Sequence, residues 1–95
     1  MEDSKKGFLK TNSKIVCREE EGDALLFNPE DGAIKILNQV GYEIWKLCDG
    51  SLTLQQIIEK LKDEYPNVPA EAIKADIVNF IKHMQNLTLI EEVAD

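Results

Sequence analysis

The segment from Ala33 to Asp49, AIKILNQVGYEIWKLCD, changes its hydrophobic period in the middle, and this change constrains the fold more than any other feature of the sequence. Its first residues, 33–37, form an apolar, partly β-branched run that predicts a strand. Asn38 is a favourable N-cap, because its side chain can accept a hydrogen bond from the free N–H groups at a helix start. The following apolar residues recur at helical spacing. The segment therefore predicts a strand joined directly to a helix.

The chain before this segment predicts two more strands. Residues 15–20 alternate in the way that a half-buried strand does, and residues 24–27 form a second apolar run. Gly22 lies in the short break between them, which favours a hairpin. The sequence NPEDG, 28–32, predicts a turn, since its proline presets φ and its glycine accepts a positive φ. Residues 33–37 then complete an antiparallel meander, and we expect an edge strand there because no later segment has the pattern of a long strand.

Three helices are predicted after the meander. The first covers residues 39–48, and Gly50 suits its left-handed end. The second begins at Thr53, where TLQQ matches the capping box S/T-x-x-E/Q, and ends before Pro66. The third covers residues 70–87. Ile73, Ile77, Phe80, Met84 and Leu87 recur at helical spacing and are predicted to face the core. The predicted fold class is α+β, a winged-helix-like arrangement of a three-stranded antiparallel β-meander followed by three α-helices.

The chain is long enough for one domain with a single core, at 95 residues. Residues 1–14 are polar and carry several lysines, so we expect a flexible N-terminal arm, with a strand lent to a neighbouring molecule as the alternative. The predicted domain covers residues 15–92, and residues 93–95 form a tail. Trp45 lies beside the apolar stripe of the first helix and is predicted to belong to the core.

The net charge of −7 opposes binding to nucleic acid, because that affinity comes largely from neutralisation of phosphates by Lys and Arg. The second and third predicted helices carry no excess of positive charge, so neither resembles a recognition helix. A winged-helix DNA-binding regulator is therefore only an alternative. No apolar run approaches the roughly 20 residues that cross a bilayer, and the N-terminus lacks a secretory signal. We expect a cytoplasmic protein that contacts neither nucleic acid nor membrane.

The residue types needed for catalysis or metal binding are sparse. His83 is the single histidine, and Cys17 and Cys48 have no spacing typical of a zinc site. A buried, reduced pair of cysteines is predicted, since a disulfide framework needs more cysteines and a secreted context. The glycines are scattered and form no phosphate-binding loop. We therefore expect no enzymatic activity, no metal and no cofactor.

The predicted edge strand is the best candidate for a binding surface. An edge exposes unpaired N–H and C=O groups, and residues 33–37 carry a single charge and no proline. A peptide can add to such an edge as a further strand, with main-chain bonds giving affinity and side-chain pockets giving specificity. On the third helix, Val78 and Ile81 lie beside the core stripe and can wall this groove, with burial by the domain itself as the alternative. The predicted peptide-binding residues are Ala33, Ile34, Lys35, Ile36, Leu37, Val78, Ile81 and, at the border of the groove, Lys74 and Gln85.

An ordered set of short motifs resembles one family. The strings GDALLFNP at 22–29, LNQVG at 37–41, IWKLCDG at 44–50, TLQQI at 53–57 and LIE at 89–91 follow one another along the chain. In this order they resemble the PqqD family, the small peptide chaperones of pyrroloquinoline quinone biosynthesis. More broadly, they resemble the recognition elements for precursors of ribosomally made, modified peptides. The similarity covers about residues 15–92, and the ordered pattern L-N-x-x-G…I-W-x-L-x-D-G-x-x-T is its most specific part.

The resemblance implies a winged-helix-like fold and a function without catalysis. It implies that the chain binds the leader of a precursor peptide as an added strand against residues 33–37 and beside the third helix. It also implies presentation of that peptide to a modifying enzyme, of the radical SAM or peptidase type. A protein–protein adaptor or oligomerisation subunit that uses the same edge is the alternative. The open edge further predicts that the free chain can form a homodimer.

Overall fold

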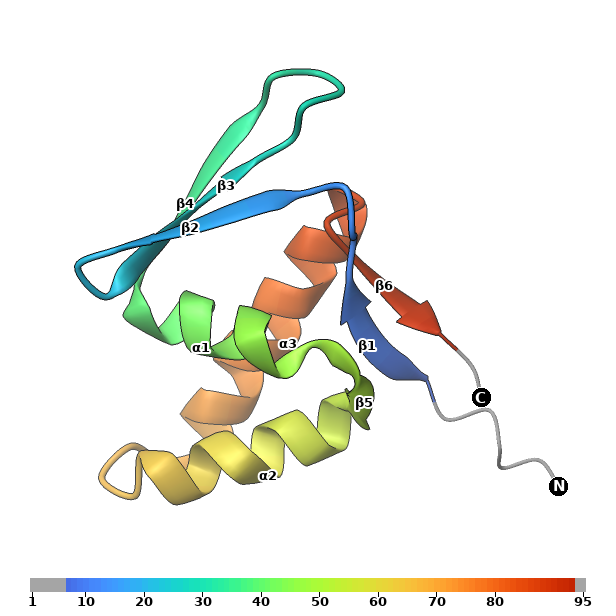
Figure 1. Ribbon diagram of the computed structural model, residues 1–95. Coiled ribbons are helices and arrows are strands. Elements are labelled where there is room, and N and C mark those ends of the chain that lie inside the picture. Colours follow the sequence, from blue (N-terminus) through green and yellow to red (C-terminus); the bar gives the residue numbers. More distant parts are fainter. Residues whose placement is uncertain (1–6, 94–95) are drawn as a thin grey trace, which may run out of the picture.

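The computed structural model describes residues 7–93, which form two antiparallel sheets and three helices, an α+β fold as predicted. In Figure 1 the sheet of order β2-β3-β4 lies above the helices, and the sheet of order β5-β1-β6 lies to one side. No helix within residues 7–93 is long and apolar enough to cross a membrane. In chain order the elements are β1 (Phe8–Thr11), β2 (Val16–Glu20), β3 (Asp23–Phe27), β4 (Ile34–Leu37), α1 (Gln39–Leu47), β5 (Asp49–Thr53), α2 (Leu54–Glu64), α3 (Ala70–Asn86) and β6 (Ile90–Val93).

The predicted meander is confirmed as β2, β3 and β4. A two-residue turn joins β2 to β3, and its residues Glu21 and Gly22 both have a positive φ, of 56° and 91°. This is the type I′ pattern, whose twist matches that of the flanking strands. In the turn before β4, Asn28 Oδ1 accepts the Glu30 N–H at 2.9 Å, and the Asn28 carbonyl accepts the Gly32 N–H at 2.7 Å. Asn28 therefore closes the turn that the sequence predicts.

The cap residues determine where α1 and α2 begin. Asn38 Oδ1 accepts the Gly41 N–H at 2.8 Å and starts α1. Thr53 and Gln56 form the complete capping box of α2. Thr53 Oγ1 accepts the Gln56 N–H at 3.3 Å, and Gln56 Oε1 accepts the Thr53 N–H at 2.9 Å. Each bond satisfies a backbone donor that a helix start otherwise leaves free, and the predicted helix starts are confirmed.

The second sheet is the largest difference from the sequence prediction. Residues 8–11 belong to the predicted flexible arm, but they form β1, the central strand of this sheet, and Leu9 is only 1% exposed. The partners of β1 lie far along the chain, with Lys10 opposite Asp49 and Leu9 opposite Glu92. A local sequence pattern does not carry such pairing, and this is why the prediction is wrong here. Residues 1–6 and 94–95, parts of the predicted arm and tail, lie outside the described residues.

A single cluster of buried side chains connects both sheets to the helices. Trp45 belongs to it at 7% exposure, as predicted. Cys48 is buried, whereas Cys17 on β2 is exposed, so the predicted buried pair is wrong for Cys17; both thiols are free. The predicted half-burial of β2 is also wrong, since all five of its residues are exposed. The reason is that α1 packs against β3 and β4, while the main neighbour of β2 is β3 alone.

Candidate functional site

β4 forms an open edge of its sheet. It pairs with β3 on one side, with Lys35 opposite Leu26 and Ile36 opposite Leu25. Among the described strands, none pairs with its other side. The edge position predicted for this strand is therefore confirmed.

The register determines which backbone groups of β4 are free. The Asn28 N–H donates to the Ala33 carbonyl at 2.9 Å, so these two residues form a hydrogen-bonded pair. Hydrogen-bonded and non-bonded pairs alternate along an antiparallel ladder, so Lys35 bonds to β3 whereas Ile34 and Ile36 do not. The N–H and C=O groups of Ile34 and Ile36 therefore point away from β3, toward the open edge.

The side chains of β4 alternate between the two faces of the sheet. Ile34 and Ile36 are 60% and 70% exposed and lie on the face that points away from the helices. On the face toward the helices, Leu37 is buried and Lys35 is half-buried. Soluble proteins usually protect an edge strand with charges, prolines or a covering segment. β4 has one lysine and no proline, so its edge is suited to pairing with another chain.

A hollow of about 200 Å³ lies beside this edge. Its wall includes Leu87, which is 43% exposed, and Leu89, which is buried; both follow the last turn of α3. The other lining residues are Leu26, Asn28, Asp31, Ala33, Ile34 and Lys35. An apolar hollow with a few polar groups at its rim suits an apolar side chain of an extended peptide.

The predicted wall residues Val78 and Lys74 do not lie on the side of α3 that is next to β4. A Cβ on Gly41 would be 3.3 Å from Phe80 Cε1, so the Phe80 side of α3 packs beside the start of α1, next to the end of β4. Val78 is two positions before Phe80, which places it on nearly the opposite side of the helix. Val78 and Lys74 line a separate hollow together with residues of β1 and the start of α2. The prediction that this flank of α3 borders the β4 edge is therefore wrong.

The structure thus divides the predicted site into two groups. Ala33, Ile34 and Lys35 line the hollow, and Ile36 extends the free backbone, whereas the Leu37 side chain is buried. The four helical residues are not brought to this edge. Ile81 is in the core at 3% exposure, Gln85 lies seven positions after Val78 on the same side of α3, and Lys74 and Val78 line the separate hollow.

Leu87 and Leu89 line the hollow, although the sequence pattern does not assign them to the site. The chain turns between them at Thr88, whose φ is 59°. The Thr88 N–H donates to the Gln85 carbonyl at 3.0 Å, and the Leu89 N–H donates to the Met84 carbonyl at 2.9 Å, a Schellman-type helix end. Glycine usually marks such an end in a sequence. Because a threonine holds this position, the sequence gives little signal that the chain folds back here.

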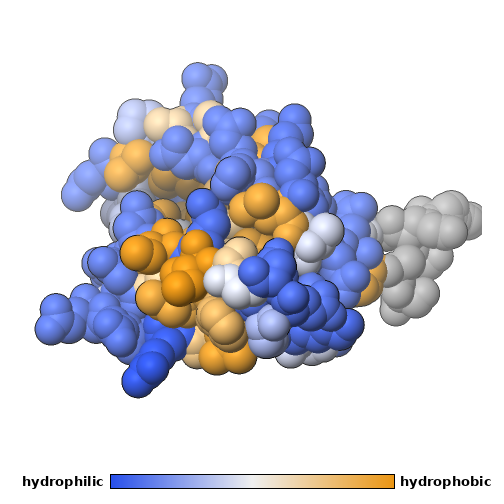
Figure 2. Space-filling view, turned by 90° about the horizontal axis from the view of Figure 1, so that it is seen from above, coloured by the Kyte–Doolittle hydropathy of each residue, from blue (hydrophilic) through white to orange (hydrophobic). Residues whose placement is uncertain are grey.

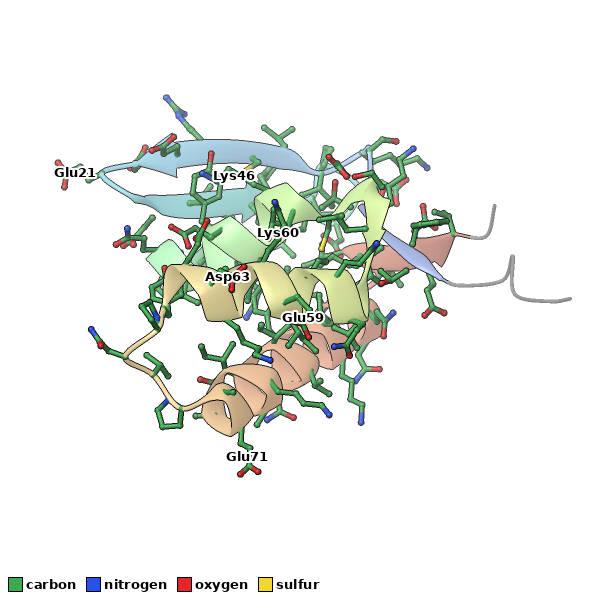
Figure 3. The ribbon with its side chains drawn as sticks, turned by 90° about the horizontal axis from the view of Figure 1, so that it is seen from below. Glu21, Lys46, Glu59, Lys60, Asp63 and Glu71 are labelled. Carbon is green, nitrogen blue, oxygen red and sulfur yellow. The ribbon has the colours of Figure 1, made fainter. Side chains whose placement is uncertain are left out.

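The opposite edge of the same sheet, along β2, is polar. Its residues include Arg18, Glu19 and Glu20, and Tyr42 Oη donates to Glu19 Oε1 at 3.4 Å. Partial burial and then the Glu19 carboxylate raise the pKa of the Cys17 thiol, and the same two causes raise the pKa of Tyr42. Figure 3 shows Glu21 at the tip of the β2–β3 hairpin, away from the helices. This edge is therefore charged where the β4 edge is apolar.

The described residues include few candidates for a metal site or a nucleophile. Within residues 7–93, no group of three or more His, Cys, Asp or Glu residues could hold a metal ion. Burial raises the pKa of the Cys48 thiol to about 12, so this thiol is not a nucleophile near neutral pH. What the geometry does provide is a free main-chain edge beside an apolar hollow.

A family model described as Coenzyme PQQ synthesis protein D (PqqD) matches residues 23–90. This range includes β3, β4 and all three helices. No curated protein sequence matches the chain.

Three solved structures share this fold. TbiB1 in complex with the TbiA(beta) leader peptide has a TM-score of 0.77 at 24% identity, over 90% of this chain and 99% of that one. The heterocyclase TruD has a TM-score of 0.63 at 24% identity, over 92% of this chain but 12% of that one. A heterocyclase in complex with substrate and cofactor has a TM-score of 0.61 at 26% identity, over 93% of this chain and 11% of that one. The fold is thus almost the whole of TbiB1 and a small part of each heterocyclase.

Proposed function

The chain belongs to the PqqD family, and from that premise we propose that it recognises the leader segment of a ribosomally made precursor peptide. It binds this leader without catalysing a reaction, and it presents the attached core segment to a modifying enzyme. The family match supports this role, and so does the likeness to TbiB1, whose structure contains a leader peptide.

The single observation that carries the proposal is the open β4 edge beside a hollow. The free N–H and C=O groups of Ile34 and Ile36 provide main-chain partners for an added strand. No strand among the described residues occupies this place. A strand that adds here brings its inward-pointing side chains next to the hollow at Leu87 and Leu89.

The binding mode defines the peptide that fits. The leader lies along β4 as a fourth strand of the β2-β3-β4 sheet, and its successive side chains alternate between the two faces. A side chain on the inner face enters the hollow and should be apolar. Asp31 and Lys35, in the lining, can pair with opposite charges of the peptide. Lys74, Val78 and Gln85 are not part of this mode, because their side of α3 does not face β4, and Ile81 is not part of it because it is buried in the core.

The enzyme partner is proposed to be of the radical SAM or peptidase type, as the family resemblance implies. The two heterocyclases support a role beside an enzyme, because each contains a region of this fold as 11–12% of its chain. A cytoplasmic location fits this role.

A calorimetric titration tests the proposal with a candidate precursor peptide, split into its leader and core halves. The leader should bind to saturation at one peptide per chain, and the core half should not bind. A DNA duplex serves as a second negative probe, because the charge of −7 opposes it. Equal affinity for both halves, or no binding of the leader, would contradict leader recognition.

A further inference from the structure

The outer face of the β2-β3-β4 sheet is apolar, and its side chains are exposed with respect to the rest of residues 7–93. The register places Val16, Phe27 and Ile34 side by side across the three strands, with Leu25 and Ile36 on the same face. The exposures of Val16, Ile34 and Ile36 are 54%, 60% and 70%. Figure 2 views the molecule from the side on which this sheet lies and shows hydrophobic side chains gathered among hydrophilic ones. We call these five residues the outer apolar face; exposed clusters of this kind mark interaction sites in soluble proteins.

An acidic hollow ends this face near the β2–β3 hairpin. It has a volume of about 520 Å³, and Leu25 and Ile36 provide its apolar part. Glu20, Glu21 and Asp23 provide carboxylates at its border. Arg18, on the same face, is the single positive charge of β2 and lies 3.8 Å from a Glu20 carboxylate oxygen. The face is therefore apolar toward the β3–β4 turn and negatively charged at the β2–β3 hairpin.

We propose that the outer apolar face docks the enzyme that modifies the bound peptide, through an apolar enzyme surface flanked by Lys or Arg. This proposal rests on the proposed function and adds the surface and the chemistry of the partner. The charges decide between occupants. A second copy of this chain would bring another acidic hollow and a net charge of −7, whereas a basic surface pairs with the carboxylates and is attracted over a distance.

The docking face is continuous with the peptide-binding edge, because both include β4. A leader that adds to β4 extends the sheet by one strand, and every second side chain of that leader then lies beside Ile34 and Ile36. The enzyme would contact this chain and the leader on one surface. Bound leader therefore raises the affinity for the enzyme, and bound enzyme raises the affinity for the leader by the same factor.

The test measures the binding of a candidate modifying enzyme of the radical SAM or peptidase type, with and without saturating leader. Val16→Asp places a charge in the outer apolar face, two strands away from the β4 edge. It should weaken enzyme binding by about tenfold or more and leave the leader affinity unchanged. Val68→Asp is the matched control, since Val68 is 41% exposed in the turn between α2 and α3. It should change neither affinity.

A second pair of variants tests the acidic hollow and stays informative if Val16→Asp unfolds. Glu20→Lys with Glu21→Lys should weaken enzyme binding by about tenfold, chiefly through a slower association. Glu59→Lys with Asp63→Lys makes the same charge change on α2, which Figure 3 shows in front when the molecule is viewed from below, opposite the sheet. This control should leave association unchanged.

The proposal is wrong if Val16→Asp and the double variant Glu20→Lys with Glu21→Lys both bind the enzyme normally. It is also wrong if the wild-type chain does not bind the enzyme with leader present, or if the chain forms a homodimer that Val16→Asp abolishes. A wild-type chain that fails to bind the leader would instead contradict the proposed function. The two failures are therefore distinguishable.

Discussion

The two edges of the β2-β3-β4 sheet are equivalent in backbone chemistry but differ in what surrounds them. The same register leaves Ile34 and Ile36 unpaired on β4, and Cys17 and Glu19 unpaired on β2. β4 has exposed isoleucines and a hollow that ends at Leu87 and Leu89, whereas β2 has charged residues throughout its second half.

This difference shows that a free backbone edge alone does not define a binding site. The charges on β2 oppose pairing with another strand, as is usual for protected edges. The β4 edge combines free main-chain groups with an apolar hollow, so pairing there also removes apolar surface from water.

Thiol labelling compares the β2 edge with the core beneath the sheet. At pH 8 a disulfide reagent should label Cys17 readily. Cys48 is 1% exposed, and burial raises its pKa to about 12, so it should react only after local or global opening of the structure. The rates should differ by about a thousandfold or more, given the several kcal/mol that such opening costs. Rapid labelling of two thiols in the folded chain would show that the core is not closed as described.

Trp45→Ala tests whether both edges depend on one core. Removal of a buried large aromatic should lower the free energy of unfolding by about 3–5 kcal/mol. Chemical denaturation measures this value, and Val68→Ala at a 41% exposed position is the control. A melting temperature equal to that of the wild type would show that Trp45 is not part of the core.

Proline substitutions separate the edges directly. Lys35→Pro removes a bond to β3 and should lower the free energy of unfolding by about 1–3 kcal/mol. Ile36→Pro removes a free N–H, so it should leave the fold intact but weaken leader binding by about fivefold or more, the value of one net hydrogen bond.

Glu19→Pro is the matched control for Ile36→Pro, because the Glu19 N–H is also unpaired but lies on β2. It should leave leader binding unchanged. If Glu19→Pro weakens leader binding more than Ile36→Pro does, the leader binds at β2, and the proposed binding at β4 is wrong.

Self-association should be the smallest effect. The free chain is expected to form a weak homodimer through β4, since two copies can pair the same unprotected edges. Sedimentation velocity at high concentration should detect it, and saturating leader should convert it to monomer. A dimer that persists with leader bound would use another surface.

Local chemistry explains how much of this structure the sequence predicts. The caps at Asn38 and Thr53 and the turn closed by Asn28 depend on residues within a few positions, and all three are confirmed. The local pattern does not predict β1, because its partners at Asp49 and Glu92 lie far along the chain. Non-local pairing is decided by tertiary packing, which a local pattern does not contain.

The candidate site divides in the same way. The edge position of β4 follows from the order of the strands and was predictable. The helical wall was not, because the choice between the Val78 and Phe80 sides of α3 depends on how closely Gly41 lets α1 approach Phe80. The turn at Thr88 brings Leu89 to the hollow, but the sequence lacks the glycine that usually marks such a turn.

Amide hydrogen exchange with and without the leader peptide distinguishes the two edges, because it reports the protection of each backbone N–H. The Ile34 and Ile36 amides should become protected when the leader binds, while the Cys17 and Glu19 amides should keep their exchange rates. Protection of Cys17 and Glu19, with Ile34 and Ile36 unchanged, would contradict leader binding at β4.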